Sequence, residues 1–109
     1  MTMDDKIRQA LLPFGDPVEN AVNHQRKSRY YVFNYTTLGA DFADDEPNHE
    51  RYLIQVHLFA PLSEDLTERI LQTKKALRDA DFGWPSTFNA SDETTRHIVF
   101  EVEAVMGVV

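Results

Sequence analysis

The sequence contains no cysteine, and this absence excludes disulfide bonds, thiolate metal sites and cysteine nucleophiles. It also lacks any apolar stretch long enough to cross a membrane. Its first residues, Met1 to Asp5, are polar and acidic, whereas a signal peptide begins with a basic segment followed by an apolar run. We therefore expect a soluble protein that is made and kept in a reducing cytosol.

Glycine and basic charge are also scarce. The four glycines, Gly15, Gly39, Gly83 and Gly107, are too scattered to form a phosphate-binding loop. The 18 acidic residues outnumber the 11 basic ones, and the resulting net charge of −7 repels nucleic acid phosphates. The one basic cluster, residues 25–29, leads directly into an aromatic segment, and we interpret it as an edge or loop feature. We expect no cofactor, no small-molecule substrate, no sequence-specific nucleic acid partner and no membrane partner.

The 109 residues fit one domain, and their hydrophobic spacing predicts an α+β fold over residues 1–109. We expect a small, mostly antiparallel or mixed sheet on which an N-terminal helix and a central amphipathic helix pack. The expected elements are helices at about 3–12 and 63–80 and strands at about 30–37, 51–59 and 95–105. Periodicity is lost over 38–48, which we interpret as a loop or an extended hairpin tip.

Residues able to support catalysis are present but do not form a known pattern. His57 and His97 fall on the less apolar faces of their strands, yet there is no H-E-x-x-H motif or closely spaced histidine pair. No G-x-S-x-G elbow is present for a serine nucleophile. The acidic run Asp44, Asp45 and Glu46 is typical of a solvated loop tip. We therefore expect no enzyme and no metal site.

The aromatic load exceeds what one face of a small sheet must bury, and the C-terminal residues are apolar as well. Aromatic residues are enriched at protein interfaces, because they give a large contact area at low entropic cost. The surplus indicates a protein partner. The candidate interface residues are Phe42, Asp44, Asp45, Glu46, Met106, Val108 and Val109.

The order of these segments resembles the small tail-completion or tail-terminator proteins of long-tailed bacteriophages and prophages. The residues that carry the resemblance are the aromatic strand 30–35, the acidic segment 43–46, the strand 51–59 and the helix end 77–82. His97 and Phe100 then fit the family's final strand. Asp81 stands where the family usually has a helix-ending glycine.

The resemblance implies a structural virion protein that assembles in the cytoplasm of a bacterial host and lies at the head-proximal end of the tail. Its implied partners are copies of itself, in a ring that matches the six-fold tail tube, together with the head-connector and tail-tube proteins. We expect residues 38–48 and the C-terminus to become ordered on assembly, with Phe42 or Val108 and Val109 against a neighbour.

An alternative interpretation is a small cytosolic protein-binding or regulatory domain that uses an open sheet face. A third, an enzyme whose site is assembled across strands, is disfavoured by the absence of catalytic motifs. The genes beside this one discriminate between the first two interpretations.

Overall fold

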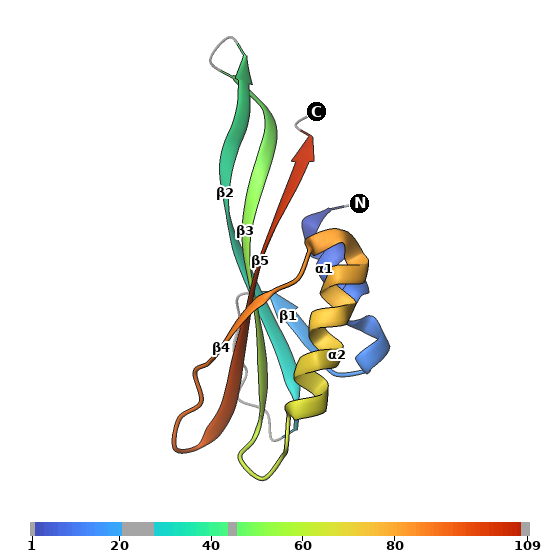
Figure 1. Ribbon diagram of the computed structural model, residues 1–109, viewed down its shortest axis with the longest axis vertical. Helices are drawn as coiled ribbons and strands as arrows, with labels where there is room; N and C mark the ends of the chain where they lie inside the picture. Colours follow the sequence, from blue (N-terminus) through green and yellow to red (C-terminus); the bar gives the residue numbers. More distant parts are fainter. Residues whose placement is uncertain (1, 21–27, 44–45, 108–109) are drawn as a thin grey trace.

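The computed structural model describes residues 2–20, 28–43 and 46–107 and has an α+β fold. Its described strands are β1 (Val18–Asn20), β2 (Tyr30–Ala43), β3 (Glu46–Pro61), β4 (Ser86–Asn89) and β5 (Thr95–Gly107). They form a sheet in the order β1-β2-β3-β5-β4, with β1 parallel to β2 and the other pairs antiparallel. The helices α1 (Met3–Leu11) and α2 (Thr67–Leu77) lie on one face of this sheet (Figure 1).

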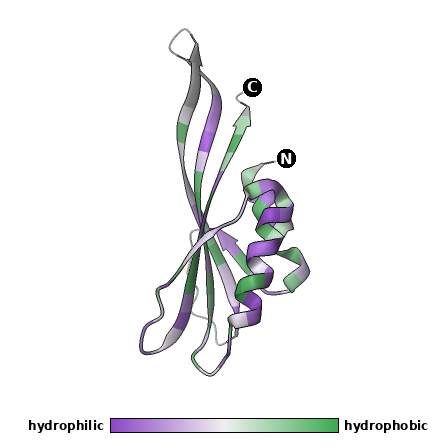
Figure 2. Cartoon of the chain, in the orientation of Figure 1, coloured by the Kyte–Doolittle hydropathy of each residue, from purple (hydrophilic) through white to green (hydrophobic). Residues whose placement is uncertain are grey.

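The hydrophobic core lies between this sheet face and the two helices. Alternate residues of β2, β3 and β5 point toward the helices, because side chains alternate between the two faces of a strand. Bands of opposite hydropathy follow one another along β3 and β5 (Figure 2). The most deeply buried core side chains are Tyr31, Phe33, Phe100, Ile7, Leu11, Ile54, Leu58, Leu77 and Val56.

The helix α1 begins with a capping box. The Asp5 backbone N–H donates to the Thr2 hydroxyl, and the Thr2 N–H donates to the Asp5 carboxylate, so two otherwise unpaired donors are satisfied. The helix ends at Leu11, and Pro13 lies in a following 3-10 turn, as its missing N–H favours. This agrees with the predicted helix of about 3–12 to within one residue.

The central helix is shorter than predicted at both ends. It begins at Thr67 instead of Ser63, because an oxygen of Asp65 accepts from both the backbone N–H and the hydroxyl of Thr67. Its regular part ends at Leu77, and a wider turn, η2 (Arg78–Phe82), follows. Leu66, Ile70, Thr73 and Leu77 all face the core, so the segment is amphipathic as expected.

Asp81 has left-handed backbone angles, with φ 70° and ψ 23°. A side chain is disfavoured in this region and glycine is not, although aspartate tolerates it better than most residues.

The prediction of a loop over 38–48 is wrong for residues 38–43 and 46–48, which belong to β2 and β3. The hairpin alternative fits the register, in which Leu38 pairs with Arg51 and Ala43 pairs with Glu46. The predicted strands 30–37, 51–59 and 95–105 are thus shorter than β2, β3 and β5, which end at Ala43, begin at Glu46 and end at Gly107, respectively. Periodicity fails here because this part of the hairpin extends past the helices, so neither of its faces has to be uniformly apolar.

Candidate functional site

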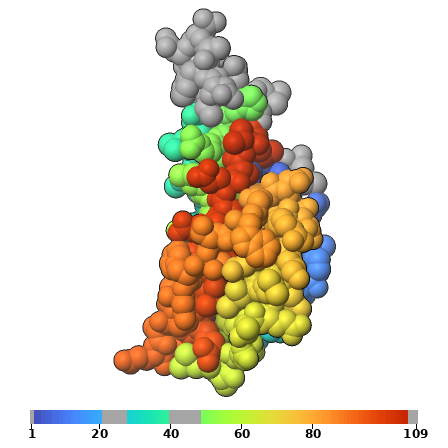
Figure 3. Space-filling view, in the orientation of Figure 1, coloured from blue at the N-terminus to red at the C-terminus, as the bar shows by residue number. Residues whose placement is uncertain are grey.

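The most prominent feature is an arm that projects from the body. We define the arm as residues 36–43 of β2, 46–53 of β3 and 103–107 of β5, which pair with one another as three strands. The molecule measures 54 × 24 × 22 Å, and its long axis follows these strands. In Figure 1 the hairpin β2–β3 extends well past the helices, and Figure 3 shows the end of β5 beside β3 above α2. Such a shape offers a large surface to neighbours.

The structure places part of the predicted interface on this arm. Phe42 pairs with Pro47, and Glu46 pairs with Ala43, both in the β2–β3 ladder. Met106 pairs with Glu50 and packs against the core cluster. Asp44, Asp45, Val108 and Val109 lie outside the described residues. The described part of the predicted interface is therefore located on the arm, while Met106 also has a role in packing.

The sheet face opposite the helices is built of rows that cross β2, β3 and β5. Near the body the residues of these rows are buried or half-buried, and along the arm most of them are exposed. The successive rows are Tyr30–Phe59–His97, Val32–His57–Val99, Asn34–Gln55–Glu101, Thr36–Leu53–Glu103 and Leu38–Arg51–Val105. Leu38 and Val105 in the last row are 52% and 58% exposed. Arg51 lies between them in the row, so the exposed apolar side chains stand at the two edges of the arm, one on β2 and one on β5.

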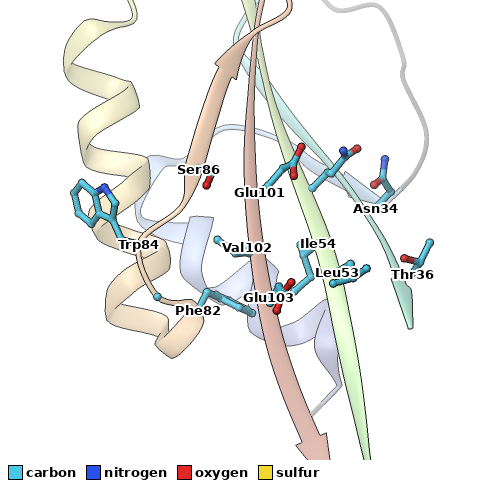
Figure 4. A pocket seen from close by; sticks show the side chains of 12 residues that line it. Asn34, Thr36, Leu53, Ile54, Phe82, Trp84, Ser86, Glu101, Val102 and Glu103 are labelled. Carbon is cyan, nitrogen blue, oxygen red and sulfur yellow. The ribbon is translucent and has the colours of Figure 1, made fainter. Parts of the chain in front are cut away.

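An open groove of about 750 Å³ follows the middle rows and reaches the segment between η2 and β4. Figure 4 shows Glu101 and Glu103 between the amide of Asn34 on one side and the ring of Trp84 on the other. Trp84 is 54% exposed, with Lys74 and Arg78 beside its ring at 5.8 and 5.9 Å from the centroid. The groove thus combines two carboxylates with an aromatic surface, which suits a peptide segment better than a small anion.

Two histidines meet on the same face, closer to the body. Nδ1 of His57 lies 2.8 Å from Nε2 of His97, and Nδ2 of Asn34 lies 3.3 Å from Nε2 of His57. With Asn34 donating, the proton of His57 is on Nδ1, which donates to His97. Phe59 stacks on His97 with a centroid separation of 4.2 Å and on Tyr30 at 5.0 Å. The pair is therefore a neutral hydrogen-bonded unit against an aromatic surface.

Burial lowers the pKa of both histidines. The pKa of His57 is lowered from 6.5 to about 4, first by burial and then by the nearby His97. Burial also lowers the pKa of His97, while the Asp92 carboxylate opposes the change. Both rings are consequently uncharged at neutral pH. Spacing along the chain gave no signal for this pair, because it depends on the register between β3 and β5.

A second polar contact joins the base of the arm to the first helix. The Tyr35 hydroxyl donates to Oδ1 of Asp4 at 2.5 Å, and Asn20 donates to the other oxygen at 2.9 Å. The hydrogen bond to Asp4 raises the pKa of Tyr35 to about 12. Tyr35 also packs edge-on against Tyr52 at 5.3 Å. These contacts tie β2, at the base of the arm, to α1 and to β3.

Within residues 2–20, 28–43 and 46–107, no group of three or more His, Asp or Glu side chains is placed to hold a metal ion. In the same part of the chain, no helix has both the length and the apolar character to span a bilayer.

Comparison with known proteins shows the fold and no more. No family model matches the sequence, and no curated protein matches it. Five chains of solved structures match. One of them, whose name describes no function, is 14% identical, with a TM-score of 0.59 over 100% of this chain and 98% of its own. The chain is thus similar to that protein along its whole length in architecture.

Proposed function

We propose that this protein is a structural component of a bacteriophage tail that completes or terminates the tail and joins it to the head connector. The observation that carries the proposal is the projecting three-stranded arm, which adds to the order of segments that resembles this family. Each subunit of a ring contacts one neighbour on each of two opposite sides. A projecting arm adds surface for such contacts without requiring a larger hydrophobic core.

The exposed apolar side chains support an assembly role. Leu38 and Val105 expose more than half of their surface on the arm. An enzyme of this size has no evident use for an apolar projection, whereas a subunit buries it on assembly. The net charge of −7 also suits a ring through which DNA passes, because acidic walls repel the phosphate backbone.

Deleting the gene from the phage or prophage that carries it tests this function directly. Induced cells should release filled heads and separate tails, visible by electron microscopy, and infectious yield should fall by several orders of magnitude. A plasmid copy of the wild-type chain should restore the yield. Normal infectious yield from the deletion strain would exclude the proposed role.

Complementation with surface variants then tests the arm. The double substitution Leu38→Glu and Val105→Glu should leave the chain folded and fail to restore yield. The control Leu71→Glu changes a residue of similar exposure, 45%, on α2 and away from the arm, and should restore it. Equal complementation by the two variants would remove the arm from the proposal.

The groove beside Glu101 and Glu103 favours a second candidate, a cytosolic domain that binds a peptide on its open sheet face. A gene neighbourhood of portal, head-completion and tail-tube genes supports the first candidate, and an isolated cellular operon supports the second.

A further inference from the structure

Among the described residues, one edge of β2 has no partner strand along the arm. The Tyr31 N–H donates to the Pro17 carbonyl at 2.8 Å, so the odd-numbered residues of β2 direct their backbone groups toward β1. The described pairing with β1 ends at Phe33. Beyond it, no strand in the described part of the chain pairs with this edge, and Tyr35 and Thr37 point their N–H and C=O groups outward.

The opposite edge of the arm, along β5, likewise has no partner strand in the part of the chain that the structure describes. The Ala90 N–H donates to the His97 carbonyl at 2.7 Å, so the odd-numbered residues of β5 direct their backbone groups toward β4. The ladder with β4 ends at the pair Ser86 and Glu101. Among the described residues no strand follows there, and the groups of Glu103 and Val105 are left without a ladder partner on that side.

The two edges complement each other. Both strands run antiparallel to β3, so β2 and β5 have the same direction and lie on opposite sides of the arm. Contact between two β5 edges would bring Glu101 and Glu103 against their own copies, which like-charge repulsion disfavours. At the β2 edge, the residues on the same sheet face are Asn34, Thr36 and Leu38, which carry no charge. Charge therefore favours β5 of one copy beside β2 of the next.

We propose that copies of this chain join head to tail by pairing the β2 edge of one arm, at Tyr35 and Thr37, with the β5 edge of the next, at Glu103 and Val105. The pairing is parallel, and the sheet continues from subunit to subunit. Each junction satisfies backbone groups that an exposed edge otherwise leaves to water. A head-to-tail contact that is repeated by rotation closes into a ring. The biological role of this ring rests on the proposed function in the phage tail.

The absence of native cysteine makes cross-linking a clean test. Thr36→Cys and Glu103→Cys place thiols at exposed positions of one row, on opposite edges of the arm. A short bismaleimide should link the two variants when they are mixed as concentrated proteins, with one carrying a size tag. The double variant should give a ladder that ends at a closed ring. Neither single variant should link to itself.

The matched control pairs Glu103→Cys with Ser63→Cys, an exposed residue in the body, and should give no mixed product. Self-linking of Glu103→Cys or of Thr36→Cys alone would indicate a two-fold contact and overturn the proposal. Absence of the mixed product at the highest soluble concentration would overturn it too.

A backbone substitution tests the hydrogen bonds themselves. Thr37→Pro removes an outward N–H while leaving the ladder to β3, and proline is tolerated at a strand edge. We expect at least a tenfold loss of cross-linked product with an unchanged circular dichroism spectrum, while Thr37→Val, which retains the N–H, should link normally. Unchanged linking of Thr37→Pro would refute strand pairing. Cross-linking is measured with purified protein, whereas tail joining is measured as infectious yield from cells. The proposed strand pairing and the proposed tail function can therefore fail independently.

Discussion

The histidine pair makes the stability of the fold depend on pH in the weakly acidic range. The folded pKa of His57 is lowered from 6.5 to about 4, so folding favours the neutral ring. The contribution of the neutral His57 ring to the free energy of unfolding is fully present above pH 6.5. It is lost as the pH falls toward 4, because the unfolded chain then binds a proton that the folded chain resists.

The size of the effect follows from the burial of the ring. The full pKa difference corresponds to an upper bound of about 3 kcal/mol. His57 is only half-buried, and solvent screening reduces this to about 1–2 kcal/mol. The pKa of His97 is also lowered by burial, and its protonation adds a loss in the same direction.

Urea unfolding followed by the fluorescence of Trp84 measures the effect at pH 7.5, 6.5, 5.5 and 4.5. The wild-type free energy of unfolding should fall by about 1–2 kcal/mol more than that of the double variant His57→Gln and His97→Gln. The acidic groups with lowered pKa values, Asp5, Asp65 and Asp92, titrate below this range and are present in both proteins. Parallel pH profiles for the two proteins would show that the pair is not the cause.

Three further changes have expected outcomes. Tyr31→Phe removes the buried 2.9 Å hydrogen bond to Thr73 and should lower the free energy of urea unfolding by about 0.5–1.5 kcal/mol; no change would mean that the hydroxyl is dispensable. Asp81→Gly should leave the midpoint of thermal unfolding unchanged or raise it. Asp81→Val should lower the midpoint, because a branched side chain in the left-handed region costs about 1–2 kcal/mol of folding free energy. Equal midpoints for the two variants would contradict the left-handed conformation. A stop codon after Gly107 retains the pairing of His49 with Gly107 and should give a folded chain that no longer completes tails; full infectious yield would exclude a docking role for Val108 and Val109.

The core of the fold was predictable because local patterns and tertiary packing agree there. Tyr31, Phe33 and Tyr35 alternate with the other face of their strand, and Leu66, Ile70, Thr73 and Leu77 recur at helical spacing. The capping box at Thr2 and Asp5 likewise involves neighbours in sequence. Each signal lies within a few residues and reports a face that must be buried.

The arm and the histidine pair depend on contacts between distant segments. Residues 38–43 become a strand because β3 supplies backbone partners, and that pairing requires no alternation of hydrophobicity when no helix covers either face. His57 and His97 are 40 residues apart, and only the register of β3 with β5 brings their nitrogens within hydrogen-bonding distance. The sequence by itself determined which residues are buried under the helices. The tertiary structure decided which strand edges stay open and which side chains meet across the sheet, because register and strand order are properties of the whole sheet.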